Sequence, residues 1–359
     1  MNDTPLERTH AVRDFRLASG MVLAEMVTAC RTLGQLNANA DNAVLVLHGY
    51  TTGPSMLDPG ANVAEGSWSE LVGPGKPIDS DRYFVICPNM LGSCYGSTGP
   101  GSINPVSGKP YGLDFPRMTM VDIVHAQKVL LDALGVRRLA AVAGPSFGGY
   151  QALQWALSYP EMVERVVAAV SAPFHPGGAG QSAGLLTMLS AAPGWAAWCS
   201  GARPEAMVEQ LTNMRIDTLT RYGVDAELAL RIPGEVQRAA ELMRLARAWA
   251  QDFDPGSLIA LMQTAETFDL RAQLASISAP VLLVLSRSDP VFSPALARQI
   301  ASLPGTANWS YVELDSDKGH FASGADAALW AGSLDAFMRA DSGSWTSFGF
   351  DISTAGEDV

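Results

Sequence analysis

The sequence predicts an α/β protein whose mostly parallel, doubly wound sheet has helices on both faces and is interrupted by an inserted helical segment. Short, uninterrupted apolar runs recur along the chain, and such runs are typical of strands buried on both faces. Helical patterns, with apolar residues every three or four positions, lie between them at residues 121–134 and 150–158. Because strand and helix alternate, the sheet should be parallel. The predicted strands cover residues 42–47, 83–87, 139–143, 166–170, 281–285 and 309–314.

A long segment in the second half of the chain departs from this alternation. Helical patterns at 205–222 and 233–251 follow one another with no strand between them, and the strand pattern resumes only at residue 281. An insertion that splits one α/β domain explains this order better than a second domain that follows the first. The predicted organisation is a core at residues 1–175 and 276–341, a helical insertion at 176–275 and a polar, acidic-ended tail at 342–359.

The composition excludes several classes of protein. The 359 residues include 24 Lys and Arg against 36 Asp and Glu, and the net charge of −12 would repel nucleic acids and anionic membrane surfaces. The uncharged stretch at 176–202 contains too many Gly and Pro residues for a membrane-spanning helix. Since no apolar leader stands near the N-terminus and the four cysteines form no C-x-x-C pair, we expect a cytoplasmic protein with reduced thiols and no metal site.

The strongest chemical signal is Gly-Pro-Ser-Phe-Gly-Gly at residues 144–149, between a predicted strand and a predicted helix. It fits a nucleophile elbow, in which the chain turns sharply and leaves a serine exposed at the corner. The glycines remove side chains that would clash there, and the N-terminus of the following helix supplies N–H groups and positive potential for an oxyanion. The sequence therefore predicts Ser146 as a nucleophile.

A serine nucleophile needs a histidine base and a carboxylate that orients the base, and after an elbow of this kind both come later in the chain. Asp289 directly follows the predicted strand at 281–285, so its loop should point at the elbow. His320 is the only histidine after Asp289. Asp315 and Asp317 are the alternatives to Asp289, but they precede His320 on its own loop. We therefore expect a Ser–His–Asp triad.

A second oxyanion donor is expected after the first buried strand, at His48-Gly49-Tyr50. The N–H group of Tyr50 is the candidate, together with that of Phe147; a glycine turn that only reverses the chain is the alternative.

The other histidines are expected to have structural rather than catalytic roles. His10 is expected in a frayed N-terminus, His125 as a packed imidazole on a helix, and His175 as a loop residue or a pocket wall.

The stretch Leu-Gly-Ser-Cys-Tyr-Gly-Ser-Thr-Gly-Pro at residues 91–100 is too long to arise by chance. It resembles one family of the α/β-hydrolase superfamily, the homoserine O-acetyltransferases and their relatives. The resemblance implies an α/β-hydrolase fold, a helical lid over a deep tunnel, an acyl-serine intermediate and a homodimer formed through lid helices. Further similar stretches are residues 15–20, 31–37, 108–112, 144–149, 151–156 and 253–258.

The sequence departs from that family at positions that the resemblance implies bind an amino-acid substrate. In the acetyltransferases an aspartate follows the histidine and is positioned to meet the ammonium group, whereas Phe321 stands here. The carboxylate-binding arginine falls in a Tyr-Arg-Ser pattern of the lid, whereas here Arg221 precedes Tyr222. A zwitterionic acceptor that lost both charged partners would be costly to bury. Arg221, Tyr222 and Phe321 are therefore the candidate substrate-binding residues.

Two enzymatic hypotheses share the acyl-serine intermediate. The first, which the missing charges favour, is hydrolysis of short-chain, acetyl-type carboxylic esters. The second is an acyltransferase that moves an acetyl group from acetyl-CoA, as co-substrate, to homoserine or a less charged alcohol. Neither requires a bound cofactor, a metal, a nucleic acid or a membrane; the ligands would be a small-molecule ester or acyl donor and an alcohol acceptor. A non-catalytic ligand-binding protein of the same fold is the third hypothesis.

Overall fold

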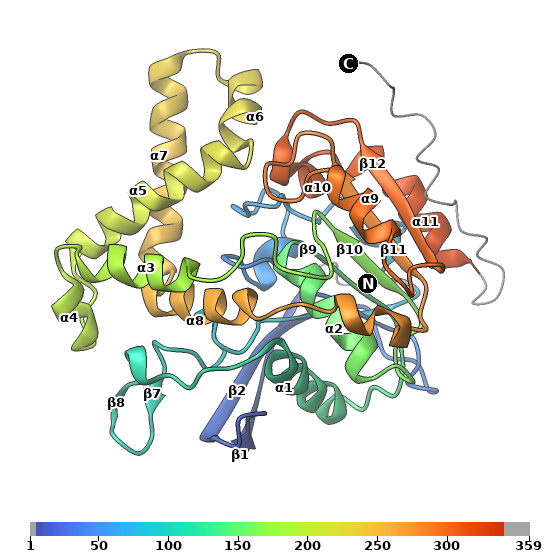
Figure 1. Ribbon diagram of the computed structural model, residues 1–359, viewed down its shortest axis with the longest axis horizontal. Helices are drawn as coiled ribbons and strands as arrows, with labels where there is room; N and C mark the ends of the chain where they lie inside the picture. Colours follow the sequence, from blue (N-terminus) through green and yellow to red (C-terminus); the bar gives the residue numbers. More distant parts are fainter. Residues whose placement is uncertain (1–4, 341–359) are drawn as a thin grey trace.

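The computed structural model describes residues 5–340, so the predicted tail at 342–359 lies outside the described residues. At its centre is an eight-stranded sheet in the order β1-β2-β6-β3-β9-β10-β11-β12 (Figure 1). From β6 to β12 neighbouring strands run parallel, as the alternation of strand and helix predicts. The parallel strands are β3 (Ala43–Val46), β6 (Phe84–Pro88), β9 (Leu139–Pro145), β10 (Val166–Ala169), β11 (Val281–Ser286) and β12 (Trp309–Leu314).

The N-terminal part of the sheet differs from the expectation. β1 (Leu6–Arg16) and β2 (Val22–Leu33) form a long antiparallel hairpin, and β2 also pairs antiparallel with β6. The expectation of a frayed end at His10 is wrong, because His10 lies within β1 and is paired with β2. Of the side chains in β1 only Phe15 is buried, so this strand lacks the apolar alternation by which a strand is recognised.

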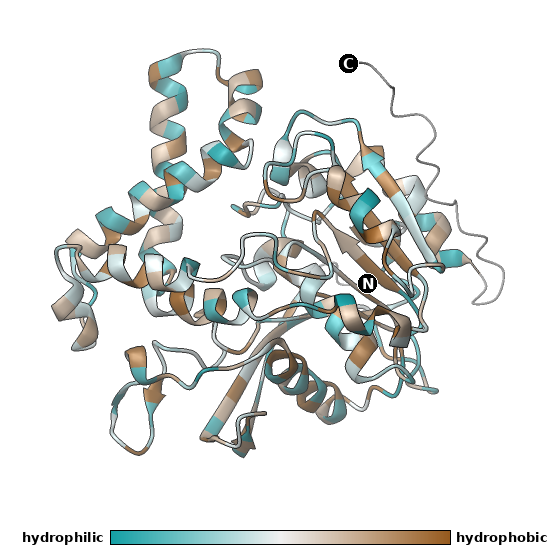
Figure 2. Cartoon of the chain, in the orientation of Figure 1, coloured by the Kyte–Doolittle hydropathy of each residue, from teal (hydrophilic) through white to brown (hydrophobic). Residues whose placement is uncertain are grey.

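Side chains of the sheet alternate between two hydrophobic cores, one on each face. In β3, Leu45 belongs to one core and Val44 and Val46 belong to the other. Figure 2 shows the central strands mostly in the colours of hydrophobic residues, whereas the helices around them are mixed. Helices α1 (Met120–Ala133), α2 (Phe147–Ser158) and α9 (Ala295–Ala301) cover the first face, and α11 (Ala331–Arg339) covers the second.

Between β10 and β11 the described chain leaves the sheet and forms helices but no strand. The N–H group of His175 donates to the carbonyl oxygen of Phe268 (3.0 Å), and that of Leu270 donates to the carbonyl oxygen of Pro173 (2.8 Å). The exit and the return of the chain therefore lie side by side, and the helices stand to one side of the sheet in Figure 1. We call these helices the lid: α3 (Gln181–Ser190), α4 (Trp195–Cys199), α5 (Glu205–Arg221), α6 (Val224–Arg231), α7 (Glu235–Asp252) and α8 (Pro255–Glu266).

The uncharged stretch at 176–202 holds α3 and α4, which Pro193 and Gly194 separate. Among residues 5–340, no helix combines the length and the apolar character needed to cross a membrane. The remaining elements are short. They are β4 (Val72–Gly73), β5 (Ile78–Asp79), β7 (Ile103–Asn104), β8 (Lys109–Pro110), α10 (Ala322–Ala325) and the 3-10 turns Pro54–Leu57, Gly112–Asp114, Arg271–Ser276, Gly319–Phe321 and Ala327–Leu329.

Candidate active site

Ser146 lies at the corner between β9 and α2, with φ 54° and ψ −121°. A positive φ is strained for a residue with a side chain and persists only where the neighbours impose it. Gly144 and Gly148 make room for the corner, because a methyl group on them would lie 2.4 Å and 2.1 Å from the carbonyl oxygen of Leu47. The hydroxyl of Ser171 donates to the carbonyl oxygen of Ser146 at 2.8 Å. These contacts hold the serine at the carboxyl edge of the sheet.

His320 and Asp289 meet at the same edge. Asp289 follows β11 and His320 follows β12, and Nδ1 of His320 lies 2.8 Å from Oδ2 of Asp289. The N–H groups of Val291 and Phe292 donate to Oδ1 of Asp289 at 2.7 Å and 3.1 Å, so both carboxylate oxygens have donors. An ionised Asp289 accepts a hydrogen bond from the N–H group of Nδ1, which leaves Nε2 as the basic nitrogen of the imidazole.

Burial and charge act in opposite directions on this pair. Burial raises the pKa of Asp289, but the charge and hydrogen bond of His320 and the two backbone N–H groups hold it below its usual value. Burial lowers the pKa of His320, but the charge and hydrogen bond of Asp289, with the charge of Glu65, hold it above its usual value. Because a general base must be neutral, activity should fall as the pH drops through this raised pKa.

The imidazole of His320 is fully buried, and its Nε2 atom has no hydrogen-bond partner among residues 5–340. The ring of Tyr222 stands edge-on to it, with centroids 4.4 Å apart, and the ring of Phe292 stacks on it at 5.7 Å. These rings fix the plane of the imidazole. A buried ring nitrogen without a partner is costly unless a reacting group uses it. No hydrogen bond joins Nε2 to Ser146 among the described residues, but the imidazole and the serine stand at the same edge of the sheet, so this unused nitrogen is the candidate general base for that hydroxyl.

The N–H groups of Phe147 and Tyr50 are the candidate donors to an oxyanion. Phe147 is the first residue of α2, where N–H groups have no partner inside the helix. Tyr50 follows β3, and its ring stacks on that of Phe147 with centroids 6.1 Å apart. The hydroxyl of Tyr50 donates to the carbonyl oxygen of Leu258 in α8, which ties this loop to the lid. Both candidate donors thus come from segments that packing holds in place.

The remaining histidines lie outside the His–Asp pair and make structural contacts. Burial lowers the pKa of His48 to about 4, which keeps the ring neutral, and its Nε2 atom accepts a hydrogen bond from the N–H group of Met90 at 3.3 Å. His175 is half-buried where the chain leaves the sheet and enters the lid. His125 is exposed, but its ring stacks on that of Phe15 at 5.3 Å and its Nδ1 atom lies 3.1 Å from the hydroxyl oxygen of Tyr159, so the expectation of a packed imidazole is confirmed.

The lid contributes a buried cation that the sequence patterns did not indicate. Arg215 of α5 is 1% exposed, and its Nη1 atom donates to Oγ1 of Thr51 at 2.8 Å. Its guanidinium lies over the ring of Trp249, 4.8 Å from the centroid. Its Nε and Nη2 atoms have no partner among residues 5–340. A desolvated guanidinium with two unused donors is suited to bind an anionic group of a ligand.

Arg221, the arginine that the sequence pattern favours, is exposed and lies over the ring of Tyr222, 5.7 Å from its centroid. The signal that could have found Arg215 is its position on the helix. It falls one turn after Leu211 and one turn before Leu219, within the buried stripe of α5, where a charged residue is unusual.

Phe321 faces the lid as an apolar contact. Its N–H group donates to the carbonyl oxygen of Tyr222 at 3.0 Å. Its partly buried ring packs against a cluster that includes Leu219 and Ala246 of the lid. The position after His320 therefore contributes no charge to the site.

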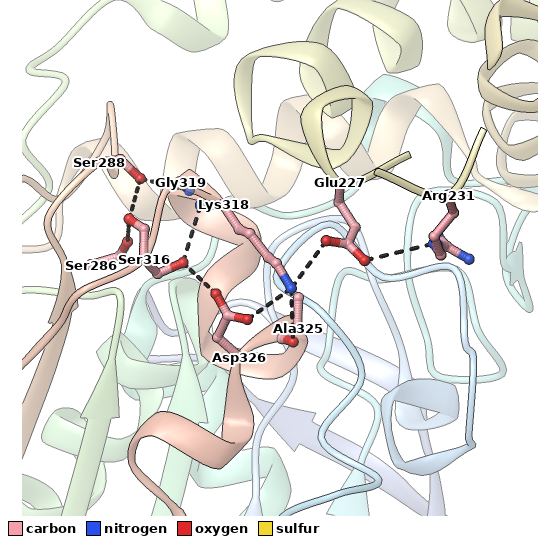
Figure 3. A network of polar contacts seen from close by, with 9 residues as sticks. All are labelled: Glu227, Arg231, Ser286, Ser288, Ser316, Lys318, Gly319, Ala325 and Asp326. Atoms are coloured by element: carbon pink, nitrogen blue, oxygen red, sulfur yellow. Dashed lines mark hydrogen bonds and ion pairs between the residues drawn. The ribbon is translucent and has the colours of Figure 1, made fainter. Parts of the chain in front are cut away.

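Lys318, two residues before His320, joins the histidine loop to the lid (Figure 3). Its Nζ atom lies 3.0 Å from Oε2 of Glu227 in α6, 2.7 Å from Oδ1 of Asp326 and 3.3 Å from the carbonyl oxygen of Ala325. Two of these contacts are ion pairs with carboxylates, and the third is a hydrogen bond to a backbone carbonyl. The position of α6 is thereby coupled to the loop that carries the histidine.

A second set of contacts in Figure 3 joins the loop of Asp289 to that of His320. The hydroxyl of Ser288 accepts a hydrogen bond from the N–H group of Gly319 at 2.9 Å and donates to the carbonyl oxygen of Ser316 at 2.7 Å. The side chain of Ser288 therefore links the loop of Asp289 to the backbone of the loop of His320.

Replacing Lys318 by methionine is expected to destabilise the protein by about 1–2 kcal/mol, because the partly buried carboxylates of Asp326 and Glu227 lose their contact with its ammonium group and only Glu227 keeps a second cation, Arg231. Thermal unfolding of the variant and the unmodified protein measures this loss. Lys128→Met is the matched control, because Lys128 pairs with Asp132 one turn away on α1 and such a helical pair contributes only about 0.5 kcal/mol. Equal melting temperatures for the two variants would show that the contacts of Lys318 do not stabilise the lid–core junction.

The family model of the α/β-hydrolase fold matches residues 42–325 of the chain. The homoserine O-acetyltransferase of Caulobacter vibrioides is 35% identical over 358 residues, which cover 92% of this chain and 94% of the relative. The homoserine O-succinyltransferase of Aromatoleum aromaticum is 36% identical over 356 residues, which cover 88% of this chain and 91% of the relative. The chain belongs to the homoserine O-acyltransferase family of the α/β-hydrolase fold.

This membership confirms the fold and the family resemblance that the motifs predicted. It also confirms that the protein is an enzyme. The crystal structure of esterase E22 is also similar, with a TM-score of 0.78 and 26% identity. The alignment covers 93% of this chain and 100% of the esterase chain. The preference for a hydrolase over an acyltransferase needs correction, because the more similar curated relatives are acyltransferases.

Proposed function

We propose that this enzyme transfers a short acyl group from an acyl-CoA thioester to the side-chain hydroxyl of L-homoserine, through an acyl intermediate on Ser146. The observation that carries the proposal is the 35–36% identity with homoserine O-acyltransferases over 88–92% of this chain. Relatives named for acetyl and for succinyl transfer are about equally similar, so either acyl-CoA is a candidate co-substrate. The homodimer and the cytoplasmic location expected from the sequence stay predictions.

In the first half-reaction, Nε2 of His320 removes the proton of Ser146, whose Oγ attacks the thioester carbonyl. Asp289 holds the imidazole and stabilises the imidazolium that forms. The N–H groups of Tyr50 and Phe147 stabilise the oxyanion of the tetrahedral intermediate. When that intermediate collapses, the carbon–sulfur bond breaks, the proton on His320 passes to the departing thiolate, and the acyl group remains on the serine.

In the second half-reaction, His320 takes the proton of the acceptor hydroxyl, whose oxygen attacks the acyl carbonyl. The bond to Ser146 breaks and the serine oxygen regains a proton from His320. Water could perform the same step, so the binding of the acceptor decides between transfer and hydrolysis. Arg215 supports transfer, because its unused Nε and Nη2 donors can form two parallel hydrogen bonds to the carboxylate of homoserine.

Hydrolysis of short-chain esters is the second candidate function. The similarity to esterase E22 favours it, and so does the apolar Phe321 at the position that the family pattern gives to an aspartate. Both functions use the same acyl-serine, so labelling of the serine does not separate them.

Product analysis separates the two functions. The protein is incubated with acetyl-CoA or succinyl-CoA, each with and without L-homoserine, and in parallel with p-nitrophenyl acetate. We expect release of CoA that depends on homoserine, with O-acylhomoserine formed in equal amount. CoA release or ester hydrolysis that proceeds without homoserine and yields no acylhomoserine would establish the hydrolase instead.

Replacing Arg215 by methionine is expected to lower kcat/KM for L-homoserine about 100-fold, since a buried charge pair to the carboxylate is lost. Steady-state kinetics at saturating acyl-CoA measure the change. Arg244→Met is the control, because Arg244 is 63% exposed on α7 and pairs with Glu241. If the two variants use homoserine equally well, Arg215 does not bind the acceptor.

A further inference from the structure

Glu65 is a buried carboxylic acid that the mechanism above does not use. It lies between the 3-10 turn Pro54–Leu57 and β4 and is 2% exposed. Its carbonyl oxygen accepts hydrogen bonds from the N–H group of Gly324, at 3.1 Å, and from the hydroxyl of Ser323, at 2.8 Å. Both donors follow His320 closely in the chain. The backbone of Glu65 is therefore held against the histidine loop.

The carboxyl group of Glu65 has no cation in contact. Its Oε2 atom has no hydrogen-bond partner, and no ion pair within 4.0 Å joins it to another of residues 5–340. Burial raises the pKa of Glu65, while the charges of His320 and Arg215 act in the opposite direction. A buried carboxylate with an unused oxygen is costly to the fold, and a ligand that completes its hydrogen bonds would offset that cost.

Glu65 and Arg215 contact the same loop at nearby residues. A methyl group on Gly49 would lie 2.0 Å from Oε1 of Glu65, so the carboxyl group packs against the α-carbon of Gly49. Arg215 donates to the side chain of Thr51, two residues further on. Since two residues of chain span at most about 7 Å, an anion and a cation with unused atoms flank Tyr50 at short range. If the N–H group of Tyr50 is the oxyanion donor, both groups lie near the acyl carbonyl that it would bind.

We propose that Glu65 binds the ammonium group of the acceptor while Arg215 binds its carboxylate. The inference rests on the proposed function and assigns the acceptor to one class, the L-α-amino acids with a side-chain hydroxyl. Such an acceptor carries both charges on one carbon atom, so it fits between a buried anion and a buried cation that do not reach each other. Its ammonium group would satisfy Oε2 of Glu65, and its carboxylate would satisfy Nε and Nη2 of Arg215.

The inference also accounts for Phe321. The family pattern places an aspartate there, whereas here the ring packs against the lid. Glu65 supplies the missing negative charge from another loop. Gly49 makes this possible, because any side chain at residue 49 would occupy the place of the carboxyl group.

The test compares L-homoserine with 4-hydroxybutyrate, which lacks only the ammonium group. In the unmodified enzyme, kcat/KM for L-homoserine should exceed that for 4-hydroxybutyrate by about 10- to 100-fold, mostly through KM. In Glu65→Gln, which keeps the size and removes the charge, this ratio should fall close to one. Glu70→Gln is the matched control, because Glu70 lies in the same segment with its side chain 72% exposed, and it should keep the original ratio.

A binding measurement gives a readout without turnover. L-2-aminobutyrate resembles homoserine without the reacting hydroxyl, and its affinity, measured by calorimetry, should fall in Glu65→Gln by the same factor as the kinetic ratio. If Glu65→Gln does not fold, Glu65→Asp replaces it, because the shorter side chain withdraws the carboxylate from the acceptor and should also reduce the ratio.

Four results would overturn the inference. A Glu65 variant that uses both acceptors less well by the same factor would show a structural role, and equal use of both acceptors by the unmodified enzyme would show that no group binds the ammonium. Transfer to homoserine with an unchanged ratio in Glu65→Gln defeats this inference alone. Transfer to neither acceptor defeats the proposed function as well, so the two failures are distinguishable.

Discussion

Ser146→Ala is expected to lower kcat for acyl transfer by about 10⁴- to 10⁶-fold and to abolish labelling by a fluorophosphonate. The variant removes the oxygen that carries the acyl group, while the oxyanion donors and the acceptor contacts remain and set the residual rate. CoA release in the presence of homoserine measures the rate, and gel fluorescence measures the labelling. Ser190→Ala, at the exposed end of α3, is the control and should behave like the unmodified enzyme.

The loss in Ser146→Ala should be chemical rather than structural. The backbone strain at residue 146 and the glycines that permit it are unchanged by the substitution. The melting temperature should therefore stay close to that of the unmodified enzyme. A variant that is still labelled and still transfers acyl groups would show that the nucleophile lies elsewhere.

Asp289→Asn is expected to lower kcat by about 10⁴-fold, because an amide in this place favours the wrong tautomer of His320. It should also move the pH dependence. The pKa of His320 lies above its usual value because the charge and hydrogen bond of Asp289 outweigh burial, so it should fall when that charge is removed. The base then stays neutral to lower pH, and the acid limb of kcat/KM should shift to lower pH on a reduced plateau.

Asp317→Asn is the matched control for this experiment. Asp317 was one of the two alternatives on the histidine loop, with Asp315, but its side chain is 85% exposed and pairs with Arg287. We expect less than about a threefold change in kcat and no shift of the acid limb. If Asp289→Asn loses less than about tenfold and keeps the original pH profile, Asp289 does not orient the imidazole.

The sequence predicted the parts of the molecule that depend on local pattern. The parallel strands were recognised because each is buried on both faces and reads as an unbroken apolar run. Ser146, Asp289 and His320 were selected because each follows a recognisable strand, and the carboxyl ends of parallel strands meet at one edge of the sheet. β1 was missed because its exposed side chains carry no such pattern, and its partner strand determines its structure.

The candidate acceptor site could not be predicted in the same way. Arg215 and Arg221 differ by less than two turns of one helix, and only the packing of α5 on the core determines that Arg215 is the buried one. Glu65 lies in an irregular segment with no periodic pattern. Its backbone contacts with Ser323 and Gly324 bring it to the histidine loop, and such long-range contacts leave no local signal in the sequence.

The central claim is that an acyl group passes from CoA to Ser146 and then to homoserine, and intact-protein mass spectrometry tests it most directly. Acetyl-CoA is added alone, and L-homoserine is added in a second step. The predicted result is a mass increase of one acetyl group that maps to the peptide carrying Ser146 and disappears when homoserine is added, with one O-acetylhomoserine released per acyl-enzyme. An acyl-enzyme that decays at the same rate with and without homoserine, or an acetyl group on another residue, would contradict the account.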